Sequence, residues 1–110
     1  MPKDPKKYLY DISESIRTIF DEYLNGIESY EGYEANTMVQ DAVERRIIII
    51  AEALYRLRRK GVTMPSGDKI INRRNTIAHQ YEEYSPRKIW ISLWDELPGL
   101  KEECDRLLEE

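Results

Sequence analysis

Residues 41–61 read DAVERRIIIIAEALYRLRRKG, and this stretch decides the fold. Apolar side chains recur around its centre at the three- and four-residue spacing of a helix, so the run from Ile47 to Ile50 belongs to a helix and not to a strand. This centre is apolar all round, and a helix that is apolar on more than one side must bury more than one side. The sequence therefore predicts that this helix lies either in the middle of a bundle or in the seam of an oligomer.

Both ends of this helix carry recognisable signals. Thr37, with Gln40 three residues later, resembles a capping box, and Asn36 is the alternative cap. At the other end, positive side chains complement the helix dipole, and Gly61 follows as the C-terminal glycine. We therefore expect a helix from about residue 37 to residue 60.

The rest of the chain is also predicted to be helical. A first helix begins at Asp4-Pro5 and meets a stop signal at Asn25-Gly26. Its apolar face comprises Leu9, Ile12, Ile16, Ile19, Phe20, Tyr23, Leu24 and Ile27. Residues 28–36 are expected to form a connection. After Pro65-Ser66-Gly67, a further helix covers residues 68–81, with Ile70, Ile71, Ile77, Ala78 and Tyr81 as its apolar positions.

The last helix is expected to begin at Ser85-Pro86 and to bury Ile89, Trp90, Leu93, Trp94 and Leu97. Pro98 either kinks it or begins a short fifth helix. The fold predicted for residues 1–110 is a single all-α domain, an antiparallel up-and-down bundle of four to five helices.

Composition excludes several kinds of site. Cys104 is the one cysteine and His79 the one histidine, so neither a disulfide framework nor a His/Cys metal site is expected, and no cofactor is predicted. No run of 18 apolar residues and no apolar leader is present, which predicts a cytoplasmic protein that does not enter the membrane.

Charge is distributed unevenly along the chain. The net charge is −4 overall, with 17 Lys and Arg against 21 Asp and Glu, but positive residues are concentrated in the middle of the sequence between two acidic flanks. A basic middle can present a phosphate-attracting surface on an acidic protein. The alternative is that these charges occupy solvated helix faces.

One cluster carries the residue types that catalysis needs. Residues 73–81 read RRNTIAHQY and include paired arginines, an amide, a phenol and the histidine. Histidine can take and give a proton near neutral pH, and an arginine fork suits a phosphate. This combination fits phosphodiester cleavage without a metal, in which a base removes the 2′-hydroxyl proton of RNA or an acid protonates the leaving oxygen.

The spacing of this cluster complicates that interpretation. Asn75 and His79 share a helix face, whereas Arg74 and His79 point about 140° apart on an ideal helix. A distorted helix, a long arginine reaching around, or a second subunit would bring them together. Alternatively, His79 is a hydrogen-bonded surface residue and Arg74 a surface cation.

At these residues the sequence resembles the HepT-like toxins of the HEPN superfamily (higher eukaryotes and prokaryotes nucleotide-binding). RRNTIAHQY fits their Arg-x4-His-x-Tyr signature, DAVERRIIIIAEALYRL looks like their second helix, and IWISLWDELPGLKEECDRLL looks like their C-terminal part. Asn72 and Ala51 stand where the family often has glycine, and these differences concern helix packing.

The resemblance implies a homodimeric, metal-independent endoribonuclease toxin, paired with a minimal nucleotidyltransferase (MNT) antitoxin that transfers AMP to the toxin. Arg74 and His79 would be catalytic at a cleft shared by two subunits, Asn75 would orient them, and Tyr81 would accept AMP. The alternative is a HEPN module that binds a nucleotide or a nucleotidyltransferase partner without cutting RNA.

Further residues have weaker claims to a role. Arg73 is a candidate supporting residue beside Arg74. Glu52 is either a buried partner for an arginine near the cleft or a surface carboxylate. The tryptophans Trp90 and Trp94 could stack on bases, although their helical spacing favours core packing. Cys104 occupies a core position and is expected to be inert.

Overall fold

The protein is built of helices. The computed structural model describes residues 4–79 and 84–110. Its helices are α1 (Pro5–Thr18), α2 (Tyr30–Glu34), α3 (Thr37–Arg59), α4 (Asp68–His79), α5 (Pro86–Asp95) and α6 (Leu97–Leu108). The described residues contain no strand, which confirms the all-α prediction. None of the helices in this part of the chain is both long and apolar enough to cross a membrane.

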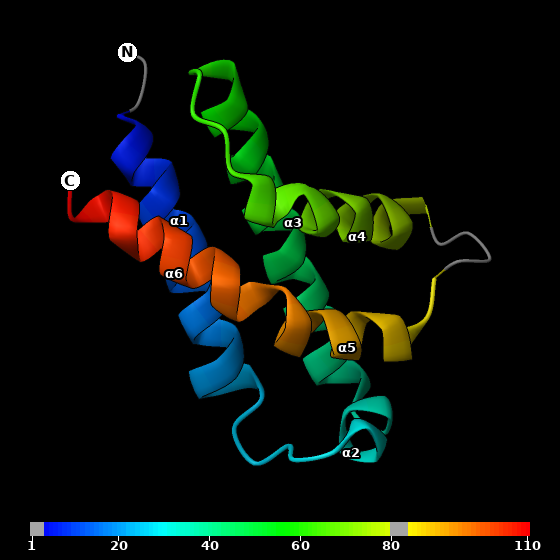
Figure 1. Cartoon of the computed structure of the whole chain (residues 1–110). Coiled ribbons are helices and arrows are strands. Elements are labelled where there is room, and N and C mark those ends of the chain that lie inside the picture. The colour runs from blue at the N-terminus through cyan, green and yellow to red at the C-terminus, as the bar shows by residue number, and fades with distance from the viewer. Residues whose placement is uncertain (1–3, 80–83) are drawn as a thin grey trace.

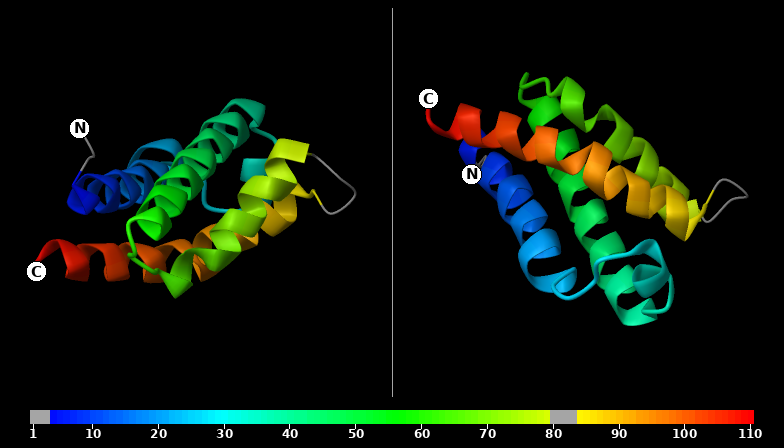
Figure 2. Two further views of the ribbon diagram at one scale, coloured as in Figure 1. Left: turned by 90° about the horizontal axis from the view of Figure 1, so that it is seen from above. Right: turned by 60° about the horizontal axis from the view of Figure 1, so that its bottom comes forward.

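The long helices pack around α3. Helices α1 and α3 run in opposite directions, and α5 and α6 follow one another across them (Figure 1). Helix α6 packs on α1, α2 packs on both α3 and α5, and α4 packs mainly on α3. Figure 2 shows the direction of α4 as opposite to that of α5 and α6. Helices α1, α2 and α4 and the turn that follows α1 therefore all contact α3, which places it centrally, as its apolar centre predicted.

The isoleucine run of α3 is not covered on every side. Ile47 and Ile50 are fully buried, whereas Ile48 and Ile49 are half-buried. The neighbouring helices thus bury the inner face of α3 and leave a strip of its apolar surface partly open. The two predictions for this helix, a central position and an oligomer seam, are compatible in this arrangement.

Side-chain hydrogen bonds fix the start of α3. Asn36 is the N-cap, and its Oδ1 accepts from the Val39 backbone N–H at 3.0 Å. Gln40 donates instead to the carbonyl oxygens of Tyr33 and Glu34, at 2.8 and 2.9 Å. The capping box expected at Thr37 is therefore wrong, because Gln40 ties α3 to the end of α2.

A short helix occupies the segment that was expected to be only a connection. Ser29 caps α2 by accepting from the Gly32 backbone N–H at 3.2 Å. Tyr33 is fully buried, and its ring lies 5.3 Å from that of Trp90. One buried tyrosine and one cap thus hold a five-residue helix that is too short to show a hydrophobic period.

The first helix changes geometry near its end. Thr18 donates its hydroxyl to the Glu14 carbonyl at 2.8 Å, and the chain continues as a π-helical turn, Ile19–Tyr23. Hydroxyl bonds of this kind tend to bend helices. Gly26, at φ 86°, then ends the segment where Asn25-Gly26 predicted a stop.

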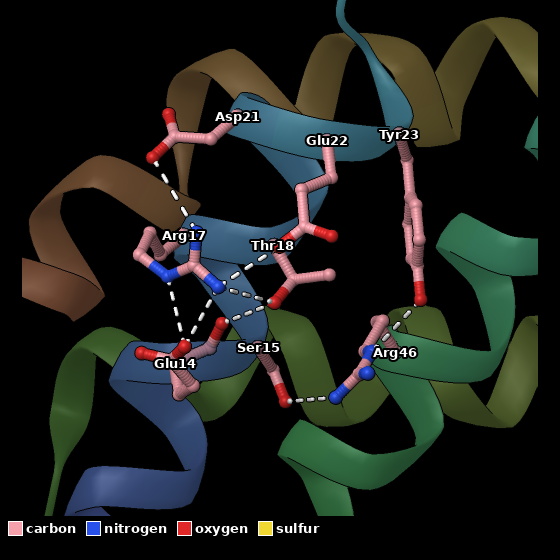
Figure 3. A network of polar contacts seen from close by, with 8 residues as sticks. All are labelled: Glu14, Ser15, Arg17, Thr18, Asp21, Glu22, Tyr23 and Arg46. Atoms are coloured by element: carbon pink, nitrogen blue, oxygen red, sulfur yellow. Dashed lines mark hydrogen bonds and ion pairs between the residues drawn. The ribbon is translucent and has the colours of Figure 1, made fainter.

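Two arginines stabilise this turn (Figure 3). Arg17 donates to Glu14 and Glu22, each at 2.9 Å, and so bridges α1 and the π-helical turn. Arg46 of α3 donates to the hydroxyls of Tyr23 and Ser15, at 3.3 and 3.4 Å. The second arginine thus joins α3 to both sides of the bend.

Pro98 lies at the start of a new helix and does not kink a continuous one. Helix α5 ends at Asp95, and α6 begins at Leu97, so Pro98 lies in the first turn of a new helix, where its missing N–H is not needed. Core packing was expected for both tryptophans. Trp90 is half-buried, but Trp94 is 48% exposed and covers Phe20 at a ring distance of 5.0 Å.

A glycine sets the distance between α3 and the turn before α4. Gly67 ends the 3₁₀ turn Pro65–Gly67 and is buried. A Cβ at this position would lie 2.7 Å from both Cδ atoms of Leu54, which is itself buried. With any larger residue here, the buried Leu54 side chain would have to shift or the turn would lie farther from α3.

We predict that Gly67→Ala lowers the free energy of unfolding by about 1–3 kcal/mol, because the added methyl overpacks the contact with Leu54. The matched control is Gly99→Ala in α6, where no heavy atom lies within 4 Å of the added Cβ. That change should be neutral or stabilise by up to about 1 kcal/mol, because alanine is the better helix former. Urea unfolding measures both, and equal effects would contradict the prediction.

Candidate active site

Helix α4 carries the catalytic candidates and buries only one narrow face. Ile70, Ile71 and Ile77 are buried on the α3 side, as expected. Asn72, Asn75, Ala78 and His79 are exposed. The prediction that Ala78 is a core position is therefore wrong, because the helix packs mainly against one neighbour. The exposed face of α4 is polar and presents a small residue beside the histidine.

Arg74 lies at the edge of this face and points toward α3. Its side chain is half-buried, and its Nη1 donates to Asn75 Oδ1 at 3.2 Å. Arg74 also lines a hollow of about 460 Å³ together with Glu52, Tyr55, Arg56 and Arg59 of α3. Asn75 thus holds the guanidinium, as a positioning residue would, and the remaining donors face a space open to a ligand.

His79 is the last residue of α4 and is exposed. The helix is regular from Asp68 to His79, so Arg74 and His79 point about 140° apart. His79 is not among the residues that line the hollow at Arg74. Within one chain, the structure therefore does not bring the two catalytic candidates to a common point.

Arg73 has a different environment from its neighbour. Its Nη2 donates to Glu96 Oε2 at 3.0 Å, and the Glu96 side chain is only 9% exposed. Glu96 lies between α5 and α6, so this ion pair joins α4 to the junction of the last two helices. Arg73 was proposed as a supporting site residue, and its observed contact is a structural one.

Glu52 is exposed, so the expectation of a buried partner is wrong and the surface alternative is correct. Its carboxylate nevertheless lines the same hollow as Arg74 and Arg56. No hydrogen bond or ion pair holds Glu52 within the described residues. It lies close to the candidate site without being committed to one arginine.

Sequence reasoning assigned no site role to three residues of this hollow: Tyr55, Arg56 and Arg59. Together with Glu52 they follow a spacing of three and four residues along α3, which places them along one side of the helix. That spacing was visible in the sequence. What it could not reveal is that Arg74 of another helix faces the same side.

Tyr81, the proposed acceptor of AMP, lies outside the described residues. Tyr84 is the first described residue after that segment, and its hydroxyl donates to Glu44 Oε2 of α3 at 2.5 Å. Burial raises the pKa of Glu44 above its usual range, while this hydrogen bond opposes the shift. The contact fixes the start of α5 to the N-terminal half of α3.

The thiol and the carboxylates offer little other chemistry. Cys104 is fully buried, and burial raises the pKa of its thiol to about 12, so it stays protonated and unreactive, as predicted. In the part of the chain that the structure describes, no three His, Cys, Asp or Glu side chains are grouped as a metal site would require.

The fold is all-helical, and Arg74 and His79 lie on one of its helices. Comparison with known sequences identifies the family of this helical protein. The profile of the family described as Ribonuclease HepT-like matches residues 12–107. The chain belongs to this HepT-like family of the HEPN superfamily, which confirms the resemblance noted in the sequence.

A relative supports the same class of activity. The archaeal protein named "Putative RNase MJ1216", from Methanocaldococcus jannaschii, is 29% identical over the whole of this chain and 93% of its own length. No solved structure matches the chain significantly. Family and relative together point to ribonuclease activity.

The adjacent residues Arg73 and Arg74 should contribute differently to the stability of the fold. Arg73→Met leaves the Glu96 carboxylate buried without its partner, and we expect it to cost about 1–3 kcal/mol of unfolding free energy, less than a fully buried pair because Arg73 is partly exposed. Arg74→Met removes a hydrogen bond between two surface groups and should cost less than about 0.5 kcal/mol. Urea unfolding of both variants makes the comparison. A larger loss for Arg74→Met would refute this assignment.

Proposed function

We propose that this protein is a metal-independent endoribonuclease and the toxin of a HEPN/MNT toxin–antitoxin pair. One observation carries the proposal: Arg74 and His79 lie on one helix whose exposed face presents His79, while Arg74 borders an arginine-lined hollow. The family match supports a ribonuclease, and the motif supplies a proton carrier and a phosphate-binding cation without requiring a metal.

The proposed reaction uses the 2′-hydroxyl of RNA as the nucleophile. His79 removes the 2′-hydroxyl proton, or in its protonated form gives a proton to the departing 5′-oxygen. Arg74 donates to the phosphate oxygens and stabilises the negative charge that develops there. Asn75 keeps the Arg74 side chain in place through their hydrogen bond. The products are a 2′,3′-cyclic phosphate and a 5′-hydroxyl.

A homodimer resolves the divergence of Arg74 and His79. Two α4 helices facing each other across a two-fold axis bring Arg74 of one protomer toward His79 of the other. The exposed Ala78 favours close approach of two such helices, and the partly open Ile48 and Ile49 of α3 supply apolar surface. The proposed active site is therefore shared by two chains.

The proposed partner is an MNT-type nucleotidyltransferase antitoxin. It would neutralise the enzyme by transferring AMP from ATP to the phenolic oxygen of Tyr81, two residues beyond His79, with loss of the phenolic proton and release of pyrophosphate. A bulky, negatively charged group beside the histidine would repel the RNA phosphate. This proposal places the toxin and its antitoxin in the cytoplasm.

Cleavage of a mixed-sequence RNA, followed by analysis of the product ends, tests the mechanism. His79→Ala should abolish cleavage, because His79 is the one histidine in the sequence and histidine is the side chain that takes and gives a proton near neutral pH. Arg74→Lys should lose most activity, because lysine keeps the charge but not the planar pair of donors. Chelators should have no effect. Full activity of His79→Ala, or inhibition by a chelator, would favour the non-catalytic binding module instead.

Mixing two inactive variants tests the shared site. In a mixture of Arg74→Ala and His79→Ala proteins, dimers that contain one chain of each retain an intact Arg74 and an intact His79 on opposite sides of the cleft. Part of the activity should therefore return on mixing, whereas each variant alone stays inactive. Sedimentation should show dimers throughout. An inactive mixture of proven heterodimers would place both groups in one chain.

A further inference from the structure

The hollow beside Arg74 contains cationic side chains that the Arg-x4-His motif does not include. Arg56 and Arg59 come from the exposed side of α3. Together with Arg74 of α4 they line a hollow of about 460 Å³. Glu52 is the one acidic residue in this lining. Three arginines thus surround a single carboxylate, and the hollow has an excess of positive charge.

These two α3 arginines are uncommitted. Arg17, Arg58, Arg73 and Arg106 all form ion pairs with carboxylates. Within the described residues, Arg56 and Arg59 form neither a hydrogen bond nor an ion pair. Three arginines that converge on one space with a single carboxylate repel each other, and an anion between them would offset that repulsion.

The polar surface continues past this hollow. A second hollow of about 260 Å³ is lined by Tyr8 and Asp11 of α1 and by Ile49, Glu52, Ala53 and Arg56 of α3. Glu52 and Arg56 line both hollows, which are therefore neighbours, but the second hollow has one arginine against two carboxylates, Asp11 and Glu52. The excess of positive charge is therefore confined to the first hollow, and phosphate binding is expected there.

Each of these two hollows also has a tyrosine ring in its lining. Tyr55 lines the first hollow and is 36% exposed, and Tyr8 lines the second and is half-buried. Arginines that track a phosphate backbone, together with aromatic rings on which bases stack, are the combination that binds single-stranded nucleic acid.

We propose that Arg56 and Arg59 bind the phosphodiester next to the one that Arg74 contacts and that is cleaved, and that Tyr55 stacks on the base of that nucleotide. This inference rests on the proposed ribonuclease function, since it takes single-stranded RNA as the ligand. Arg56, Arg59 and Tyr55 are positioning residues: they hold the RNA so that the neighbouring phosphate reaches Arg74. Glu52 opposes the bound phosphate and limits its affinity.

Binding is measured in the full-length His79→Ala protein, so that the RNA stays intact. The probe is a fluorescently labelled, mixed-sequence, single-stranded oligoribonucleotide, titrated at several salt concentrations. Arg56→Gln with Arg59→Gln should weaken binding by about tenfold or more and lower the salt dependence by about one released counterion for each arginine. Tyr55→Ala should weaken binding by about fivefold or more. Glu52→Gln should tighten it.

Arg106→Gln is the matched control. It removes one positive charge, as each of the two hollow substitutions does, but from α6, where Arg106 lines a different hollow between α1 and α6. Its affinity and salt dependence should stay at the parent values. If the Arg56 and Arg59 variants bind RNA as the Arg106 variant does, the subsite does not exist. The proposal would also be overturned if excess inorganic phosphate competed as effectively as unlabelled RNA, because the hollow beside Arg74 would then bind a free anion.

Cleavage kinetics separate this inference from the proposed function. In the wild-type background, Arg56→Gln should raise KM more than it lowers kcat, because Arg56 binds the RNA away from the reacting atoms. If wild type binds RNA through Arg56 and Arg59 but cuts nothing, the subsite is supported and the ribonuclease proposal fails. If the variants cut with unchanged KM, the ribonuclease proposal stands and the subsite fails.

Discussion

The close contact between Gly67 and Leu54 joins the start of α4 to α3, and the candidate site depends on that placement of α4. A turn without a side chain lies directly against the Leu54 methyl groups, and α4 starts from there. Ile70 and Ile77 then bury themselves on the α3 side. As a result, Arg74 comes to lie over the exposed stripe of α3, and the hollow forms between the two helices.

The same placement assigns opposite tasks to two neighbouring residues. Arg73 and Arg74 are about 100° apart on the helix. One reaches Glu96, a carboxylate with 9% of its side chain exposed, and joins α4 to the junction of α5 and α6. The other keeps most of its donors for the hollow. Identical side chains therefore stabilise the fold in one case and, in our proposal, bind the ligand in the other.

Much of the fold could be predicted because long helices carry their own signals. The extent of α3, its C-terminal glycine and the helix starts at Asp4 and Ser85 follow from local preferences for caps, proline and period. The prediction failed where tertiary contacts overrode or replaced such signals. Helix α2 is held by the burial of Tyr33, and Gln40 turned away from Thr37 to bind the end of α2. Neither contact produces a periodic pattern in the sequence that could have predicted it.

The sequence by itself determined the all-α class, the central helix and the catalytic candidates, because helical period and residue chemistry are local properties of the chain. The tertiary structure decided which faces remain open. It exposed Ala78 and Trp94, paired Arg73 with Glu96, and left Glu52 on the surface beside Arg56 and Arg74. The physical reason is that burial and pairing depend on the neighbouring helix, and a close approach such as that of Gly67 to Leu54 fixes which neighbour each side chain meets.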